Sequence, residues 1–264
     1  MNKHLLVTDA ANFTVAFEIN PYMHQVDQPD HKLAMAQHEA IMQAHRNAGR
    51  TLKYLPTASD CPDMIYVANS GLVRGNKVIL SQLPKERQPE MPHYRKWYQE
   101  HGFKVIEPPA LFSGQGDALP CGDYVLMGTG WRTDPIMHQF VADNLGYEVV
   151  SLQTTGPEYY DIDLAVAVLR PNLIAFCPEA LTADSVAKLK NLPGVDYIII
   201  SLKETQHFAA NLVSDGEVVI MTNDAPEFAK AIEAHGLKTV QLPTDQLAKG
   251  GGAIRCTSLA LDNQ

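Results

Sequence analysis

The chain ends in Gly250-Gly251-Gly252-Ala253-Ile254-Arg255-Cys256-Thr257-Ser258-Leu259-Ala260-Leu261, where three glycines precede a cysteine and a short apolar strand. Glycine loses more backbone freedom on folding than any other residue, so three in a row indicate a tight turn or a close approach to a ligand. A cysteine at the mouth of the following strand is typical of a nucleophilic thiolate on a glycine-rich loop. A lone cysteine is more often a small buried core residue, so the rest of the chain must decide between these interpretations.

The composition predicts a soluble protein with a substantial core. The chain has 264 residues, 45% of them hydrophobic, which fits one large domain or two small ones. Its formal net charge of −9 disfavours nucleic acids and anionic membranes as partners and permits a cationic ligand. Nothing in the sequence approaches the roughly 18 apolar residues of a membrane span or a signal-peptide core. We therefore expect a cytoplasmic protein, with a homodimer as a possible assembly.

The four cysteines are Cys61, Cys121, Cys177 and Cys256, and they lie far apart in the sequence. None forms a CxxC pair or has the Cys/His spacing of a zinc site. The sequence therefore predicts reduced cysteines without a disulfide framework, and no metal or cofactor.

One structural plan recurs along the chain: a helix, a strand, a loop and two strands joined by a tight turn. The predicted helices cover residues 31–47, 94–101, 136–145, 184–192 and 226–235. The strands that follow them cover 52–55, 104–106, 148–150, 197–200 and 238–240. The predicted hairpins include 65–80, turning at Gly75, and 209–221, turning at Ser214-Asp215-Gly216; two others turn at Gly122 and Pro171, and the fifth unit ends at the Cys256 strand.

Five such units predict a closed, pseudo-fivefold α/β propeller of ββαβ repeats that forms one domain over residues 1–264. The strand over residues 4–7 can pair with the terminal strand and close the ring, which removes exposed sheet edges. The alternative is an ordinary three-layer α/β fold. In the propeller, the loop after each strand lies at the same end of the pseudo-axis, so residues distant in sequence converge on one pocket.

Those loops carry a resemblance to a known superfamily. The segments are Cys61-Pro62-Asp63-Met64-Ile65-Tyr66-Val67-Ala68-Asn69, Gly114-Gln115-Gly116-Asp117, Trp131-Arg132-Thr133-Asp134 and Tyr160-Asp161-Ile162-Asp163. In this order, and with the terminal GGGxxRC motif, they resemble the guanidino-group-modifying superfamily. That superfamily includes arginine deiminases, dimethylarginine dimethylaminohydrolases and amidinotransferases. The resemblance covers nearly the whole chain and implies the five-bladed pentein fold.

The resemblance implies a role for each motif residue. Cys256 corresponds to the nucleophile, and Asp63 and Asp163 to the carboxylates that hold a planar guanidinium while the thiolate approaches its face. Arg132 would bind the α-carboxylate of the substrate through a bidentate fork. Asn69 lies in Ala-Asn-Ser-Gly, which is similar to the Ala-Asn-Ala-Gly of arginine dihydrolases; its amide would also tolerate a neutral ureido group. Outside the resemblance, Asp63 can equally be a turn residue, Asp163 a buried acceptor and Arg132 part of a surface ion pair.

Two positions depart from the superfamily pattern. Ser113 occupies the place of the usual glutamate, and Asp161 that of the general acid/base histidine. Asp117 would orient the catalytic acid/base or contact the guanidino nitrogens. None of the ten histidines lies in a motif, and the nearest substitute, His207, is more typical of a loop or structural residue.

The sequence therefore predicts a Cys256-dependent hydrolase that cleaves C–N bonds of a guanidino or ureido amino acid such as arginine or a methylarginine. A covalent thiouronium-type intermediate would form and then be hydrolysed by water. Two alternatives remain: an amidinotransferase, and a binding protein that has kept the pocket but lost turnover with the histidine.

Overall fold

The computed structural model describes residues 1–263, which form a mixed α/β fold with five three-stranded sheets. The strands are β1 (His4–Val7), β2 (Thr51–Tyr54), β3 (Gly71–Arg74), β4 (Lys77–Leu80), β5 (Lys104–Ile106), β6 (Ala118–Cys121), β7 (Tyr124–Met127), β8 (Glu148–Ser151), β9 (Val166–Arg170), β10 (Leu173–Phe176), β11 (Asp196–Ile199), β12 (Val213–Ser214), β13 (Val218–Thr222), β14 (Lys238–Leu242) and β15 (Ser258–Ala260). The helices are α1 (His31–Asn47), α2 (Met91–Glu100), α3 (Ile136–Leu145), α4 (Ala183–Lys190), α5 (Leu202–Thr205), α6 (Pro226–Ala234) and α7 (Asp245–Ala248). Because the strands form five separate sheets, the three-layer alternative is wrong.

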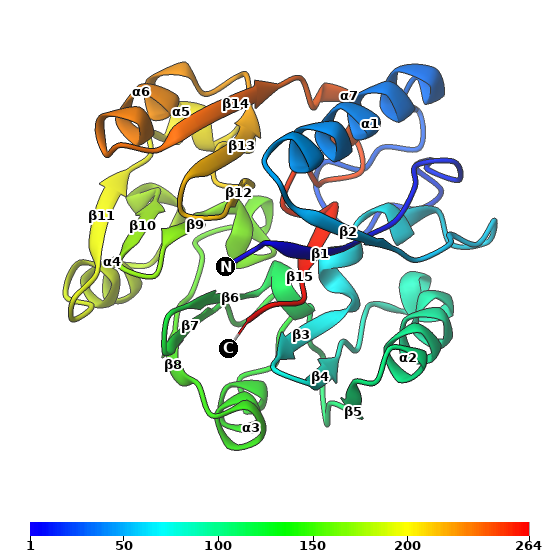
Figure 1. Cartoon of the computed structure of the whole chain (residues 1–264), viewed down its shortest axis with the longest axis horizontal. Helices are drawn as coiled ribbons and strands as arrows, with labels where there is room; N and C mark the ends of the chain where they lie inside the picture. The colour runs from blue at the N-terminus through cyan, green and yellow to red at the C-terminus, as the bar shows by residue number, and fades with distance from the viewer. Residues whose placement is uncertain (264) are drawn as a thin grey trace.

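Each sheet repeats one topology, as the sequence predicted. An antiparallel pair is joined by a helix to a third strand that lies parallel to the middle one, as in β3, β4, α2 and β5. Helices α1 and α3 have the predicted limits, and α3 ends where Gly146 adopts the left-handed φ of 73° that glycine favours. In Figure 1 the five sheets lie around a common centre and the longer helices lie on the outside.

The two ends of the chain share one sheet. β1 is its middle strand, antiparallel to β15 with Leu5 opposite Ala260 and parallel to β2 with Leu5 opposite Leu52. This pairing confirms the predicted contact between the first strand and the terminal strand. It also places β15, and with it the segment that follows the glycines, near the common centre of the sheets (Figure 1).

Three predicted strand segments are local turns instead. Residues 65–70 belong to the 3-10 turns Pro62–Ile65 and Val67–Ser70, in which the Tyr66 amide donates to the Asp63 carbonyl and the Asn69 amide to that of Tyr66. Residues 209–212 also turn, and β15 begins at Ser258 rather than at Cys256. In each case nearby carbonyls accept hydrogen bonds from the backbone amides, so these residues need no partner strand. The side-chain pattern alone therefore placed the strand limits incorrectly.

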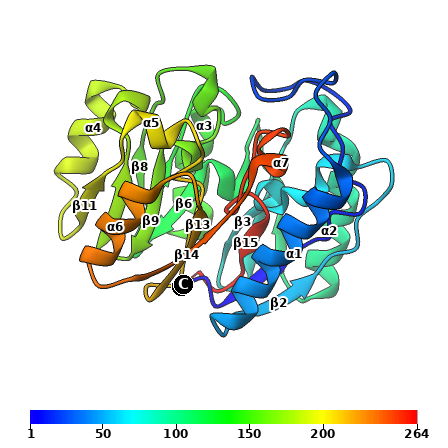
Figure 2. The same ribbon diagram turned by 90° about the horizontal axis from the view of Figure 1, so that it is seen from above.

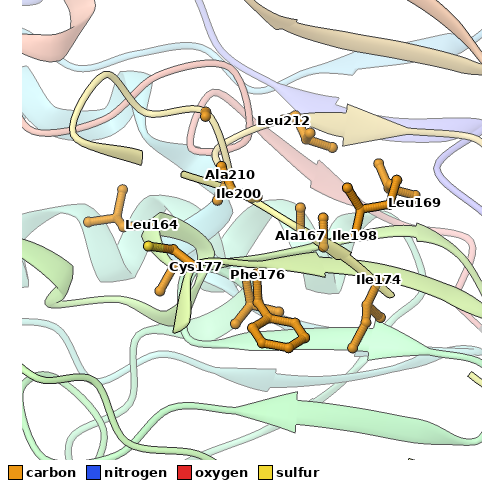
Figure 3. Packing of buried hydrophobic residues seen from close by; sticks show 14 of the residues in the cluster. Leu164, Ala167, Leu169, Ile174, Phe176, Cys177, Ile198, Ile200, Ala210 and Leu212 are labelled. Atoms are coloured by element: carbon orange, nitrogen blue, oxygen red, sulfur yellow. The ribbon is translucent and has the colours of Figure 1, made fainter. Parts of the chain in front are cut away.

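The largest apolar cluster joins the sheet of β9, β10 and β11 to its neighbours. Figure 3 shows Ala167 and Leu169 of β9 together with Ile174 and Phe176 of β10. They pack in one cluster with Leu212, which comes just before β12 of the next sheet. The mutual burial of neighbouring units fixes the loops at the centre relative to one another.

A long loop over residues 8–30 joins β1 to α1. In Figure 2 it lies on the side of the molecule opposite the C-terminus. Its Ile19 carbonyl accepts from Arg132, and the Asn20 side chain donates to the Gly250 carbonyl. The loop therefore covers the Gly250–Gly252 turn. Within residues 1–263, none of the helices has the length and apolarity needed to cross a membrane.

Candidate active site

The three glycines let the last loop pass close to bulky side chains. A Cβ on Gly252 would lie 2.6 Å from the Tyr66 ring and 2.9 Å from Cys256 Cβ. Gly251 has a φ of +90°, and a Cβ there would collide with Asn20. Of the two predicted reasons for the glycines, the tight turn is confirmed, and the close neighbours of the turn are protein side chains. Substitution here would move the loop that presents Cys256.

Cys256 is 4% exposed, and its Sγ lies between two polar groups. The Asn211 amide donates to Sγ at 3.1 Å, and the thiol donates to Asp163 Oδ2 at 3.5 Å. Asn211 Oδ1 also accepts from the backbone amides of Ala253, Arg255 and Cys256 at 3.0–3.3 Å. One amide side chain therefore both shapes the cysteine turn and contacts the sulfur.

Burial raises the pKa of the Cys256 thiol well above its ordinary value, and the Asp163 carboxylate raises it further. The hydrogen bond from Asn211 opposes this shift because it stabilises the thiolate. The net shift favours the protonated thiol in the free protein. A cation bound beside it would favour the thiolate.

Asp63 lies in an interior ion-pair network. Arg87 forms a two-pronged pair with Glu90, with both N–O distances 2.8 Å, and its Nε lies 3.8 Å from Asp63 Oδ2. Burial raises the pKa of Asp63 to about 7, Glu90 raises it too, and Arg87 opposes the shift. Because Arg87 is already matched by Glu90, the negative charge of ionised Asp63 remains available to another cation.

Asn69 holds Asp161 in place. Its Nδ2 lies 2.9 Å from Ser113 Oγ and 3.0 Å from Asp161 Oδ2, and its Oδ1 accepts from Arg87 at 2.8 Å. Protein groups thus engage both ends of the Asn69 amide, although the sequence predicted direct contact with substrate. Ser113, in the place of the superfamily glutamate, belongs to the same network.

Burial raises the pKa of Asp161, while Arg132, Ser113 and Asn69 oppose the shift by favouring the carboxylate. A carboxyl group with a raised pKa therefore lies at the position where the superfamily has its histidine.

Asp117 positions the segment between Asp161 and Asp163. Its Oδ1 accepts from the Ile162 backbone amide at 2.9 Å, and Thr133 donates to the same side chain. A Cβ on Gly128 would collide with Asp117, so that glycine makes room for the carboxylate. Of the two predicted roles, these contacts favour orientation of the catalytic segment.

Arg132 lies against the face of the Tyr160 ring, with the guanidinium carbon 3.9 Å from the ring centre. Its Nη1 is 4.0 Å from Asp161 Oδ2, and Nη2 donates to the Ile19 carbonyl of the covering loop at 3.2 Å. Tyr160 in turn donates to the Gly251 carbonyl. Arg132 therefore connects the covering loop, the catalytic segment and the glycine turn.

In the motif loops, three buried carboxylate oxygens have no hydrogen-bond partner among residues 1–263: Asp63 Oδ1, Asp161 Oδ1 and Asp163 Oδ1. Native proteins rarely leave such atoms unsatisfied. All three come from segments singled out in the sequence. A planar cation with several N–H donors would satisfy them, and a guanidinium has five.

Sequence reasoning missed Asn211 and Arg87. Asn211 is a polar residue within the apolar run Ala209-Ala210-Asn211-Leu212-Val213, which was the available signal. Arg87 lies in a charged segment typical of a solvated loop, so its burial was not apparent. His207 is exposed in a turn and is not a hydrogen-bond partner of Cys256.

The family model for eukaryotic N,N dimethylarginine dimethylhydrolase matches residues 9–261. The chain is also 34% identical to the N(G),N(G)-dimethylarginine dimethylaminohydrolase of Mycobacterium tuberculosis, over 97% of this chain and 84% of that one. The chain belongs to the dimethylarginine dimethylaminohydrolase family. It is thus a member of a family of amidine hydrolases, and the predicted superfamily is confirmed.

The chain is also similar to arginine dihydrolases. The chain is 30% identical to the bifunctional arginine dihydrolase/ornithine cyclodeaminase ArgZ of Synechocystis, over 97% of this chain and 37% of ArgZ. The crystal structure of the N-terminal domain of ArgZ, bound to product, matches with a TM-score of 0.92 at 30% identity and covers 98% of this chain and 97% of that domain. Another structure of that domain is covalently bound to a reaction intermediate.

Proposed function

We propose that this protein hydrolyses a C–N bond of a guanidino amino acid, arginine or a methylated arginine, with Cys256 as the nucleophile. The observation that carries the proposal is the set of three unpartnered oxygens of Asp63, Asp161 and Asp163. A guanidinium would supply the missing donors and neutralise part of the buried negative charge. The five repeats would form one pseudo-fivefold propeller domain that brings these segments together.

The contacts of Cys256 suggest the first step. The thiol proton passes to Asp163 Oδ2, its hydrogen-bond partner, as the sulfur adds to the central guanidino carbon. Asn211 would stabilise the thiolate as it forms. The same proton then leaves with the departing amine, and a thiouronium attached to Cys256 remains.

Water completes the reaction. It adds to the thiouronium carbon, the carbon–sulfur bond breaks, and the ureido product and the Cys256 thiol are released. The net change is guanidinium plus water to ureido group plus ammonium or alkylammonium. Asp161, held by Asn69 and close to Arg132, would act as a further carboxylate for the substrate rather than as an acid. Arg132 would bind the α-carboxylate after giving up its contact with Ile19.

A second round of hydrolysis is favoured by Asn69, since its segment is similar to that of arginine dihydrolases. A ureido product kept in the site would then be cleaved to an amine. A second hydrolysis would give ornithine, whereas a protein that only binds its ligand would give no product.

The test incubates the purified protein with arginine, monomethylarginine and asymmetric dimethylarginine and quantifies ammonia, alkylamines, citrulline and ornithine. Cys256→Ser is the control. We expect product from at least one substrate with the native protein and none with the variant. Thermal stabilisation by all three ligands without any product would show that the protein only binds them; equal product from Cys256→Ser would exclude the thiol mechanism.

A further inference from the structure

A second cysteine lies in a cluster of metal-ligating groups outside the Cys256 site. One ligand atom from each of Asp60, Cys61 and His93 lies within 4.8 Å of the other two. The Cys61 thiol donates to Asp60 Oδ1 at 3.7 Å. The sequence predicted no zinc site because it has no Cys/His spacing; the fold brings His93 to the cysteine from the first turn of α2.

The scaffold around these side chains is well fixed. The Cys61 amide donates to the Ala58 carbonyl at 3.1 Å, and its own carbonyl accepts from Met64 at 3.1 Å. Cys61 is 2% exposed and belongs to the same apolar cluster as Met91 and Tyr94 of α2. Asp60 is exposed. The cluster therefore has an apolar rear wall and a side that is open to solvent.

We propose that Asp60, Cys61 and His93 bind a transition-metal ion of the zinc class, with the fourth position left to water. Sulfur and imidazole ligands select Zn²⁺ or Co²⁺ over Mg²⁺ and Ca²⁺, which prefer oxygen ligands alone. Ligand bonds of about 2.0 to 2.3 Å require the three side chains to close on the ion by about 1 Å. The ion would tie the segment before Asp63 to the start of α2.

Metal binding exchanges one proton for the ion. The Cys61 thiol loses its proton to solvent, a metal–sulfur bond forms, and no oxidant or reductant takes part. The affinity therefore increases with pH, because a proton competes with the metal.

The test uses Co²⁺ and the Cys256→Ser protein, so that the nucleophilic thiol cannot bind the metal. We expect one equivalent of cobalt to give the charge-transfer absorption of a cobalt–thiolate bond, and one equivalent of Zn²⁺ to remove it. Adding Cys61→Ser should abolish the band. Adding Cys121→Ser, which removes a different buried thiol, should leave it unchanged.

His93→Gln keeps Cys61 in place and tests the site even where Cys61→Ser perturbs folding. Loss of an outer-shell partner alone weakens metal binding about tenfold or more, so loss of this ligand should weaken cobalt binding at least as much. A thiolate band that survives Cys61→Ser, an unchanged affinity in His93→Gln, or no band at saturating cobalt would each overturn the proposal. None of these measurements depends on turnover at Cys256.

Discussion

At the scale of single residues, two neighbours of Cys256 act in opposite directions. Asp163 accepts the thiol proton and raises the pKa of the thiol, whereas the Asn211 amide donates to the sulfur and lowers that pKa. Both side chains are buried, so little water screens either effect. Their balance determines how readily the free protein forms a thiolate.

Asp163→Asn should speed alkylation of Cys256 by iodoacetamide at pH 8 by about tenfold, since one pKa unit changes the thiolate fraction tenfold. Asn211→Asp should slow it, because the new carboxylate keeps the backbone acceptor but adds negative charge beside the sulfur. Peptide mass spectrometry of timed samples gives both rates. Identical rates in the two variants would contradict the assigned contacts.

Asp161→His should increase the hydrolysis of arginine or methylarginine by about tenfold, a fraction of the roughly 10²-fold that a well-positioned general acid contributes. The physical reason is that an imidazole titrates near neutral pH, while a bound guanidinium and Arg132 would favour the carboxylate of Asp161 against the burial that raises its pKa. Steady-state rates measured between pH 6 and pH 9 test this. If Asp161→His and Asp161→Asn both abolish a robust native activity, then Asp161 is itself the acid/base.

Arg132→Ala should weaken binding of an α-amino-acid substrate by roughly 2 kcal/mol or more, since the carboxylate would lose a charge-assisted pair. Isothermal calorimetry on the Cys256→Ser protein measures this without turnover. Arg132→Lys should recover part of the affinity, because it keeps the charge but loses the fork. Equal affinity in Arg132→Ala and the parent would place the carboxylate elsewhere.

At the scale of elements, α1 buries two histidines. The helix begins after Asp30, whose side chain accepts from the Leu33 amide at 3.0 Å, and its inner face includes Ile41 and Met42. His38 and His45 lie on the same face, and Nε2 of each has no partner among residues 1–263. Burial lowers the pKa of His38 to about 4 and that of His45 to about 3.

A histidine whose pKa is lowered by folding destabilises the protein as pH falls below its unfolded value of about 6.5. His38→Leu should therefore gain stability over the native protein as pH falls, by about 2 kcal/mol at pH 5. Urea unfolding at pH 7 and pH 5 measures the difference. A difference between His38→Leu and the native protein that is the same at both pH values would contradict the prediction.

At the scale of the whole molecule, the fold concentrates negative charge at the meeting point of its units. Burial raises the pKa values of Asp63, Asp117, Asp161 and Asp163, and the charges of Asp161 and Asp163 reinforce the effect on their neighbours. A folded-state pKa above the unfolded value means that ionisation costs stability. That cost is fully present above the folded pKa and disappears as pH falls toward the unfolded value.

Arginine should therefore stabilise the protein more at pH 8 than at pH 6.5, because its cation offsets carboxylate charge that exists only at the higher pH. Asp63, with a pKa of about 7, should alone account for about 1 kcal/mol of the difference. Thermal unfolding with and without arginine at both values tests this, and the comparison at one pH cancels the contribution of His38. Asp63→Asn should raise the stability of the free protein at pH 8 and reduce the effect of arginine; equal stabilisation at both pH values would contradict the idea.

The repeated elements and the order of the motif loops could be predicted from the sequence. Local periodicity and turn chemistry, which neighbouring residues encode, predict the limits of α1 and α3 and the turn at Gly75. The repeated plan of the chain predicts the pairing of the first and last strands. Three sets of contacts could be seen only in the folded chain. The Asn69 amide forms hydrogen bonds with Arg87 and Asp161, Asn211 contacts Cys256, and His93 lies beside Cys61. These properties depend on burial and on partners from distant parts of the chain, because the energy of a polar group depends on the solvent it loses and the groups it meets.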